Sequence, residues 1–473
     1  MRKITIDPVT RIEGHAKITI HLGDDGQVAR TQFHVTQVRG FEKFTEGRPY
    51  YEMPGITARI CGICPLSHLL ASAKACDAIM AVRIPPVAAL LREAIHCGQI
   101  VQSHALSFFH LSAPDLLLGM DSDPARRNIL GLAEQHPALA RDGIALRKFG
   151  QRVIERIAGE RIHPSGIVPG GVAAPLAAAG RDAILQELPE AVAIARRTLE
   201  LFKTILDGFR GEIEHFGRMP TMYAGLVDAA GALQLYDGQI RFKSATGGIV
   251  AQIDAARYNN YIGEASLADS YLKAPYFLPL GYPDGIYRVG PLARLNVADR
   301  CGTPAADIEL GEFRQRCGAI AESSFHYHYA RLIEIVYGLE RLEALLNSPL
   351  ILDRHVRAHA AVNALEGIGV AEAPRGILIH HYRVDERGAM KWANMIIATG
   401  HNNLALNRSI EQVSKHYVHG ERMEEGMLNR VSAVVRAYDP CLSCSTHAGG
   451  LAPMRIQLVG ADGAVLDELA AGA

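Results

Sequence analysis

Two pairs of cysteines with Cys-x-x-Cys spacing stand near opposite ends of the chain and could hold a metal. The first pair is Cys61 and Cys64, the second is Cys441 and Cys444, and a histidine follows each pair within four residues. Four thiolates select a soft or borderline metal: zinc, an iron–sulfur cluster, or nickel with iron. The pairs of a zinc ribbon are usually about 15 to 20 residues apart, whereas Cys61 and Cys441 are 380 positions apart. This spacing favours a buried catalytic centre that joins the two ends of the chain, with a closed structural zinc site as the alternative.

The residues beside the cysteines favour thiolates. Pro65 directly follows Cys64 and suits the first position of a helix. Two thiols on such a turn face the same point, and a helix N-terminus lowers the pKa of a thiol. The other four cysteines match no ligand motif, so we assign them to packing; they are Cys76, Cys97, Cys301 and Cys317. The histidines at 104, 110, 380 and 381 also show no ligand spacing.

A framework must bring the two cysteine motifs together, and its first part is a small sheet. Apolar and polar residues alternate over residues 16–22 and 28–38, on either side of Asp24–Asp25–Gly26. This pattern predicts two strands joined by a turn. Further along the chain, apolar residues recur with helical spacing over 86–111, 189–216 and 322–347. Helices of this length indicate a bundle.

No linker or internal repeat divides the chain. We therefore predict a mainly α fold with α+β elements, in which residues 1–447 form one large domain. A long-helix bundle forms its core, a small N-terminal β-sheet lies within residues 1–40, and β elements stand at the ends. The metal site bridges the N- and C-terminal segments.

Composition limits the function classes. The 473 residues are 48% hydrophobic and carry a net charge of -1, which gives no electrostatic reason to expect nucleic acid or an anionic membrane surface as a partner. No signal peptide and no membrane-spanning run is present, so we expect a cytoplasmic protein with no membrane span. No dinucleotide fingerprint or phosphate-binding loop occurs, so any nucleotide must bind another subunit.

Three further motifs join the cysteine pairs: Arg11–Ile–Glu–Gly–His15, Arg39–Gly–Phe–Glu42 and Ala373–Pro–Arg–Gly376. Together the five segments resemble the large, catalytic subunit of nickel–iron hydrogenases, from residue 7 to residue 447. The segments 56–68 and 439–447 are most similar to the cytoplasmic, bidirectional branch that couples to NAD.

The resemblance implies a nickel–iron centre. Cys61 and Cys441 would be terminal ligands of nickel, and Cys64 and Cys444 would bridge nickel to iron. In this family the iron also carries carbon monoxide and cyanide, which maturation proteins install. His68 would lie behind the bridging sulfur and direct an N–H toward it.

The resemblance also gives Arg375 and Glu13 roles in the reaction. Arg375 would hang over the open metal position as a rigid donor fork, with Asp439 or Asp115 as its anionic partner. Glu13 would lie within hydrogen-bond reach of the Cys441 sulfur and receive the proton. A carboxylic acid beside a thiolate is expected to have a raised pKa.

Glu42 and His447 resemble the ligands of the buried divalent cation of this family, usually assigned as Mg²⁺. The family motif ends at His447, and the resemblance implies that residues 448–473 are a maturation peptide, removed by an endopeptidase after nickel-insertion proteins have acted. Within that peptide, residues 454–459 alternate like a strand, and a turn follows at 461–463.

Electrons need a route that this chain does not encode, because the remaining cysteines form no cluster spacing. The resemblance implies an iron–sulfur small subunit, and a diaphorase module that binds flavin and NAD. Two alternatives remain. One is a hydrogen-sensing regulatory subunit. Residues 448–473 argue against it, because sensors in this family typically lack the cleaved peptide. The other is a zinc-stapled structural subunit of a respiratory-type complex, whose relatives have lost some of the four cysteines.

Overall fold

The N-terminal segment forms the predicted small sheet. The computed structural model describes residues 2–267, 270–419, 424–447, 454–459 and 465–471. Strands β1 (Arg2–Ile6), β2 (Ala16–Leu22) and β3 (Val28–Val35) pair in that order, each antiparallel to the next. Ile18 and Ile20 are fully buried on one face, so the alternation in the sequence corresponds to a half-buried sheet.

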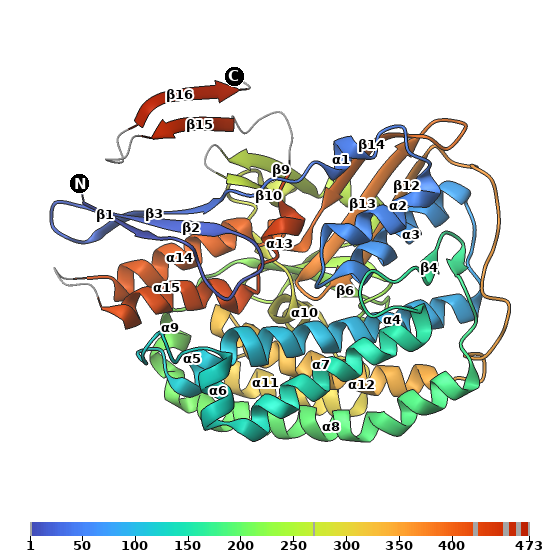
Figure 1. Cartoon of the computed structure of the whole chain (residues 1–473), viewed down its shortest axis with the longest axis horizontal. Helices are drawn as coiled ribbons and strands as arrows, with labels where there is room; N and C mark the ends of the chain where they lie inside the picture. The colour runs from blue at the N-terminus through green and yellow to red at the C-terminus, as the bar shows by residue number, and fades with distance from the viewer. Residues whose placement is uncertain (1, 268–269, 420–423, 448–453, 460–464, 472–473) are drawn as a thin grey trace.

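Long helices form the largest layer, along the lower half of Figure 1. They are α4 (Pro86–Ala105), α7 (Pro137–Ala158), α8 (Ala178–Leu206), α11 (Pro304–Cys317) and α12 (Tyr327–Leu346). The bundle predicted from helical periodicity is confirmed. The helix predicted from residue 189 begins eleven residues earlier, at Ala178, so Pro189 lies inside α8. Burial of Leu188, Ala191 and Ile194 in the core offsets the lost backbone hydrogen bond.

The helix predicted over 86–111 changes character at its end. After α4 the chain continues as a π-helical segment, η3 (Leu106–Ser112), and then as α5 (Ala113–Leu118). The shorter helices are α1 (Phe41–Phe44), α2 (Met53–Thr57), α6 (Ile129–Gln135), α9 (Arg210–His215), α10 (Pro291–Val297) and α13 (Ala398–His401).

The placement of β structure at the ends alone is wrong, because three sheets and a short hairpin lie in the middle of the chain. One has the order β11–β6–β7–β8, from Tyr287–Arg288, Met222–Val227, Gln239–Lys243 and Ile249–Asp254. Another pairs β12 (Glu366–Ala373), β13 (Gly376–Val384) and β14 (Met390–Ile396). β9 (Ile262–Leu267) pairs with β10 (Ser270–Phe277), and β4 (Ile167–Val168) with β5 (Gly171–Val172). All six residues of β6 are buried, and a short run without alternation cannot be told from a buried helix by its periodicity.

Helix α3 (Pro65–Met80) packs directly on strand β12. Two glycines of β12 allow this approach. A Cβ at Gly367 would lie 2.2 Å from the Ala75 carbonyl oxygen, and one at Gly369 would lie 1.9 Å from that of Ala71. The strand that leads to Arg375 is therefore held against the helix that follows the first cysteine pair.

The two ends of the chain meet beside this layer. Helices α14 (Asn403–Tyr417) and α15 (Glu425–Tyr438) lie next to the N-terminal sheet (Figure 1). Glu13 forms a parallel β-bridge with Cys441, just before α16 (Leu442–Ser445). The predicted joining of N- and C-terminal segments is thus found.

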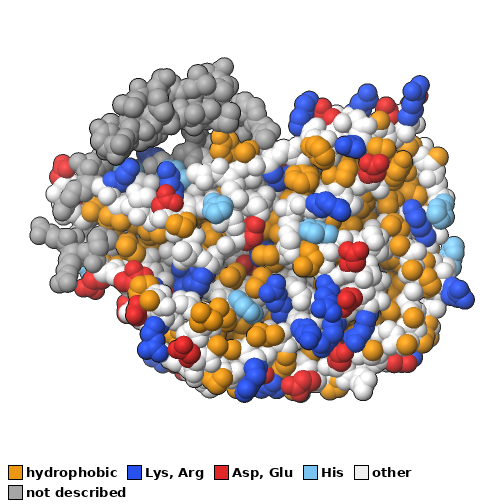
Figure 2. All heavy atoms as spheres, in the orientation of Figure 1, with side chains coloured by type: hydrophobic (Ala, Val, Ile, Leu, Met, Phe, Trp, Pro, Cys, Tyr) orange, Lys and Arg blue, Asp and Glu red, His pale blue; other side chains and the backbone are white. Residues whose placement is uncertain are grey.

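The C-terminal strands β15 (Met454–Val459) and β16 (Val465–Ala471) pair antiparallel with each other. The predicted strand at 454–459 is confirmed, whereas the turn at 461–463 and residues 448–453 lie outside the described residues. Positive and negative side chains are interspersed over the face shown in Figure 2. Within the described ranges, no helix is both long and apolar enough to cross a membrane.

Candidate metal centre

Four buried thiols converge at one point. The Sγ atoms of Cys61, Cys64, Cys441 and Cys444 all lie within 4.8 Å of one another. Cys61 Sγ is 3.5 Å from Cys441 Sγ, and Cys64 Sγ is 3.8 Å from Cys444 Sγ. Among the residues that the structure describes, this is the one group of three or more histidines, cysteines or carboxylates close enough to hold an ion. The structure therefore brings together all four predicted ligands.

The first pair is set by the start of α3. Cys64 is the N-cap residue and Pro65 occupies the first turn, as predicted. The backbone N–H groups of Ile63 and Cys64 donate to Cys61 Sγ, over 3.2 and 3.4 Å. Two amide side chains of α4, Gln99 and Gln102, donate to the Ile63 carbonyl oxygen over 2.9 and 2.8 Å. The turn between the two thiols is thus fixed from both sides.

The second pair is set by the end of α15. Asp439 caps this helix in the left-handed conformation, with φ 52°, which few residues other than glycine adopt. The Cys441 N–H donates to Thr399 Oγ1 over 2.9 Å, and Arg39 Nε donates to the Cys444 carbonyl oxygen. Both cysteines are thereby held by residues far away in the sequence.

Three of the four thiols have pKa values shifted in different directions. Hydrogen bonds from Cys441, Cys444 and Cys64 hold the pKa of Cys61 well below its usual value. Burial raises the pKa of both Cys441 and Cys444. Metal binding must therefore displace protons from these thiols, which couples it to pH.

Arg375 lies beside the thiols and pairs with Asp439. Its Nε donates to the Asp439 carbonyl oxygen over 2.5 Å, and its Nη2 to Oδ1 over 3.0 Å. Burial lowers the pKa of Arg375, but the charge of Asp439, followed by electrostatic interaction with the neighbouring cysteines, outweighs burial and raises it, so the group stays charged. Nη1 is buried without a hydrogen-bond partner, which leaves one donor free next to the cysteine cluster.

The expectation that Asp115 could pair with Arg375 is wrong, because Asp115 pairs with other arginines. Its carboxylate pairs with Arg11, with Arg127 over 3.4 Å and with Arg436 over 2.8 Å. Burial raises the pKa of Asp115, but Arg436 and Arg11 outweigh burial and lower it. Asp115 therefore ties the N-terminal Arg11 motif to α15, a pairing that only the tertiary structure decides.

Glu13 reaches the second cysteine pair through Ser443. The backbone oxygen of Glu13 accepts from the Leu442 N–H over 3.2 Å. Its carboxylate accepts from the Ser443 N–H over 3.2 Å and from the Ser443 hydroxyl. The hydrogen bonds that we expected to go to the Cys441 sulfur go instead to the residue between Cys441 and Cys444.

Glu42 and His447 also converge, as predicted. Glu42 Oε1 is 3.4 Å from His447 Nε2, which in turn lies 3.2 Å from the Met395 carbonyl oxygen. Burial, followed by the nearby charge of Arg39, lowers the pKa of His447 to about 2, so the imidazole is neutral. A carboxylate, a carbonyl and a neutral imidazole are donors that a divalent cation accepts. Arg39 Nη1 also pairs with Glu42 Oε1, over 2.9 Å.

Comparisons with known proteins agree with this geometry. The family described as nickel-dependent hydrogenase matches residues 39–127 and 235–447, which is more than half of the chain. A family described as HoxL-like matches residues 3–38. The chain belongs to the nickel-dependent hydrogenase family. The resemblance read from the sequence motifs is confirmed.

Individual relatives of this hydrogenase chain cover nearly its full length. The NAD-reducing hydrogenase HoxS subunit beta of Cupriavidus necator is 40% identical, over 99% of each chain. A chain of the F420-non-reducing hydrogenase vhu of Methanocaldococcus jannaschii is 43% identical, over 88% of this chain and 99% of the relative. A crystal structure of NAD⁺-reducing [NiFe]-hydrogenase in the H2-reduced state has a TM-score of 0.92 and 44% identity, over 94% of this chain and 100% of that one.

One contact of His68 in this hydrogenase chain that the sequence interpretation missed is His380. Its Nε2 lies 3.1 Å from His68 Nδ1, and its Nδ1 lies 2.5 Å from the Tyr382 hydroxyl, which donates to Ser72. His68 Nε2 is buried without a hydrogen-bond partner, and burial lowers the pKa of His68 to about 4. His380 and His381 are neighbours in the sequence and show no ligand spacing. On strand β13 they point to opposite faces, so His380 can contact His68 without His381.

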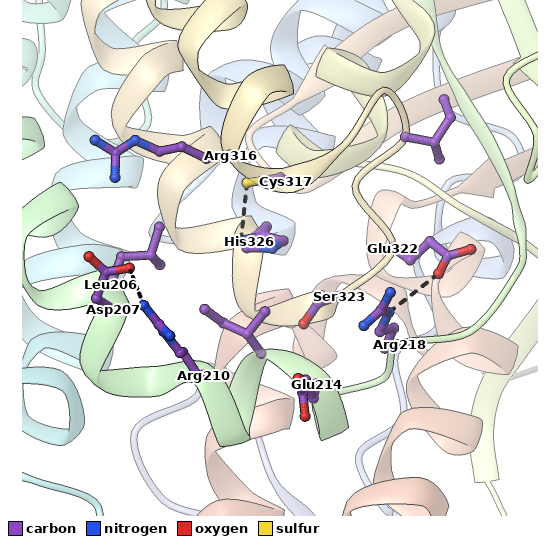
Figure 3. Close-up of a pocket in the computed structure, with 12 residues that line it drawn as sticks. Leu206, Asp207, Arg210, Glu214, Arg218, Arg316, Cys317, Glu322, Ser323 and His326 are labelled. Atoms are coloured by element: carbon purple, nitrogen blue, oxygen red, sulfur yellow. Dashed lines mark hydrogen bonds and ion pairs between the residues drawn. The ribbon is translucent and has the colours of Figure 1, made fainter.

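The other cysteines of the hydrogenase chain lie away from the cluster. Cys76, Cys97 and Cys301 are buried, as the packing role requires, but Cys317 is half-buried. It lines a cavity of about 400 Å³ between the end of α8 and the end of α11 (Figure 3), where its Sγ lies 3.5 Å from His326 Nδ1. None of the four clustered cysteines lines this cavity.

Proposed function

We propose that this chain is the catalytic subunit of a nickel–iron hydrogenase that reversibly splits H2 into protons and electrons. The observation that carries the proposal is the convergence of four buried thiols from both ends of the chain. Cys61 and Cys441 would bind nickel as terminal ligands, and Cys64 and Cys444 would bridge it to an iron that carries carbon monoxide and cyanide. When bound, this centre supplies the Lewis-acidic metal that polarises H2.

Arg375 and Asp439 would act beside that centre. The unpartnered Nη1 of Arg375 would offer a hydrogen-bond donor to substrate beside the four thiols, while Asp439 holds the other side of the guanidinium. A charged donor in a buried, dry site stabilises developing negative charge more than it does in water. Its planar fork fixes the direction of that donor.

Glu13 takes up the proton. Its carboxylate is hydrogen-bonded to the Ser443 hydroxyl and N–H, between the two cysteines of the second pair. Glu13 is half-buried whereas Cys441 and Cys444 are buried, so Glu13 has more access to solvent than the two thiols. His68 is held by His380 through Nδ1, and its buried Nε2 has no hydrogen-bond partner.

Glu42, His447 and the Met395 carbonyl would hold Mg²⁺. The buried Glu42 Oε1 lacks a hydrogen-bond partner although it pairs with Arg39, which suits a site completed by a cation. We also propose that an endopeptidase cleaves after His447, so that the mature chain ends at this ligand. Intact mass of the active enzyme checks the cleavage, and an active chain that still ends at Ala473 contradicts it.

Electrons leave through an iron–sulfur small subunit, because the four thiols outside the cluster are dispersed. An apolar cavity of about 640 Å³ beside the first cysteine pair suits that partner; it is lined by residues that include Phe41, Phe44, Tyr51, Ile56 and Ile167. Phe44 and Tyr51 are each 59% exposed, which is typical of an interaction surface. The NAD-reducing relatives support a diaphorase module as the final acceptor. All eight cysteines are unpaired, which suits the cytoplasm.

Metal analysis tests the proposal. The purified, mature enzyme is expected to hold nickel and iron in equal amounts, and Cys61→Ser is expected to lose the nickel. Cys76→Ser is the matched control, because Cys76 is equally buried but donates to the Tyr50 carbonyl oxygen outside the cluster. Zinc alone in the wild type would contradict the proposal and favour a structural subunit. Nickel and iron without turnover would favour a hydrogen sensor.

A further inference from the structure

Arg294 lies behind the loop that carries Arg375, and every N–H donor of its guanidinium is used. Nε donates to Glu334 Oε1 over 2.6 Å, and Nη2 to Glu334 Oε2 over 2.6 Å. Nη1 donates to Glu372 Oε2 over 2.7 Å. The two remaining N–H groups donate to carbonyl oxygens of the loop, Nη1 to Ala373 over 2.9 Å and Nη2 to Pro374 over 3.0 Å.

The partners of Arg294 are fully buried and come from separate elements. The side chains of Arg294, Glu334 and Glu372 are 0% exposed. Glu334 also lies 2.7 Å from His104 Nε2 of α4, and Glu372 accepts from the Leu226 N–H of β6 over 2.9 Å. Helices α4, α10 and α12 are thus connected with strands β6 and β12 immediately behind the turn that leads to Arg375.

That turn needs support from outside. Ala373 pairs with Gly376, so Pro374 and Arg375 alone connect β12 and β13. The turns that suit such a short hairpin require positive φ at their first residue, whereas a proline ring fixes φ near -65°. Neither Pro374 nor Arg375 has a positive φ. The two carbonyl oxygens that Arg294 binds belong to the residues at the start of this turn.

The loop is also closed from its other side. A Cβ at Gly290 would lie only 2.7 Å from the Arg375 carbonyl oxygen. Gly290 directly precedes α10, the helix that carries Arg294. The Val289 carbonyl oxygen accepts from the Tyr327 hydroxyl over 2.9 Å. The backbone of Arg375 therefore rests against the same short segment from which Arg294 reaches its two neighbours.

We propose that Arg294 is a positioning residue for catalysis: it fixes the Pro374–Arg375 turn so that the Arg375 guanidinium faces the metal centre. The inference rests on the role of Arg375 given under Proposed function. A buried ion pair alone is weak evidence for such a role, since apolar residues often stabilise a core as well. A general structural role does not require Arg294 to donate hydrogen bonds to the Ala373 and Pro374 carbonyl oxygens, which directly precede Arg375.

Arg294→Lys tests the inference, because lysine keeps the charge between the two glutamates but lacks the planar fork. We expect its kcat for H2 oxidation with a dye acceptor to fall by about ten- to a hundredfold, with nickel and iron content unchanged. The infrared bands of the iron-bound carbon monoxide and cyanide should move. Arg92→Lys is the matched control: Arg92 is equally buried, pairs with Asp77 and donates to the Val168 and Gly171 carbonyl oxygens, away from this loop.

The double variant decides between positioning and general support. If Arg294 acts through Arg375, Arg294→Lys combined with Arg375→Lys is no slower than Arg375→Lys alone. Three results would overturn the inference while leaving the role of Arg375 intact: losses in kcat that add in the double variant, a wild-type kcat for Arg294→Lys, or infrared band shifts in Arg92→Lys equal to those in Arg294→Lys. A wild-type rate for Arg375→Lys refutes that role itself, and the inference with it. Should Arg294→Lys not fold, Glu372→Gln, which keeps an acceptor for Leu226, is judged by the same comparisons.

Discussion

Glu13 contacts Ser443, between the two cysteines of the second pair, and is the proposed proton acceptor. We expect Glu13→Gln to lower H2 turnover about a hundredfold or more, because glutamine keeps the contacts with Ser443 but cannot take up a proton. Nickel and iron content should stay at the wild-type level, and H2/D2 exchange should fall with turnover. Glu46→Gln, an exposed glutamate of the same N-terminal region, should change neither. Undiminished exchange in Glu13→Gln would remove Glu13 from the proton path.

The hydrogen-bond chain behind His68 gives a second residue-scale prediction. Tyr382→Phe removes the hydroxyl that contacts His380 Nδ1 and donates to Ser72. A buried ring nitrogen left without a partner costs about 1 to 3 kcal/mol, so the free energy of unfolding in denaturant should fall by that amount. Tyr51→Phe, at a tyrosine that is 59% exposed, should have no effect. Equal stability of the two variants would show that water replaces the lost hydroxyl.

Single functional residues could be predicted from the sequence where they belong to a short sequence motif. The four cysteines follow from spacing, and the Arg375–Asp439 pair follows from the family motifs around them. Asp115 was equally suited to Arg375 by sequence, but three other guanidinium groups surround it in the fold. Such competition between long-range partners of the same charge leaves no trace in a single sequence.

At the scale of elements, the close approach of β12 to α3 depends on a missing side chain. In Gly369→Ala, the new Cβ would lie 1.9 Å from the Ala71 carbonyl oxygen, so strand and helix must separate. We expect a loss of about 3 kcal/mol in the free energy of unfolding, and lower turnover because β12 leads to Arg375. Gly311→Ala in α11, where nothing lies within 4 Å, should instead gain up to about 1 kcal/mol. The denaturant midpoints of the two variants check both signs, and similar midpoints would contradict the strain.

Elements were predictable according to the regularity of their patterns. The strand at 16–22 alternates clearly between apolar and polar residues, and helix α7 has one apolar face. Strand β6 was missed because burial on both faces removes the alternation. The early start of α8 was missed because Pro189 indicates a helix start, and only core packing reveals that the helix runs through it.

At the scale of the whole molecule, several histidines are enclosed in the core in their neutral form. Burial lowers the pKa to about 3 in His96, His328 and His401, and to about 4 in His326, from 6.5. The unfolded chain binds more protons at these groups than the folded chain below pH 6.5, so they add stability above pH 6.5 that is lost as pH falls toward 3 to 4. At pH 5.5 each group costs about 1.4 kcal/mol.

The four costs together amount to roughly 5.6 kcal/mol, which is comparable with the net stability of many proteins. We therefore expect the denaturant midpoint to fall steeply between pH 7 and pH 5.5. His328→Leu should reduce the loss of unfolding free energy over this pH range by about 1.4 kcal/mol, because it removes one buried titrating group. The same substitution at the exposed His355 should leave the loss as it is in the wild type. If His328→Leu keeps the wild-type loss, His328 is protonated within the folded core, and its burial does not determine how the molecule responds to acid.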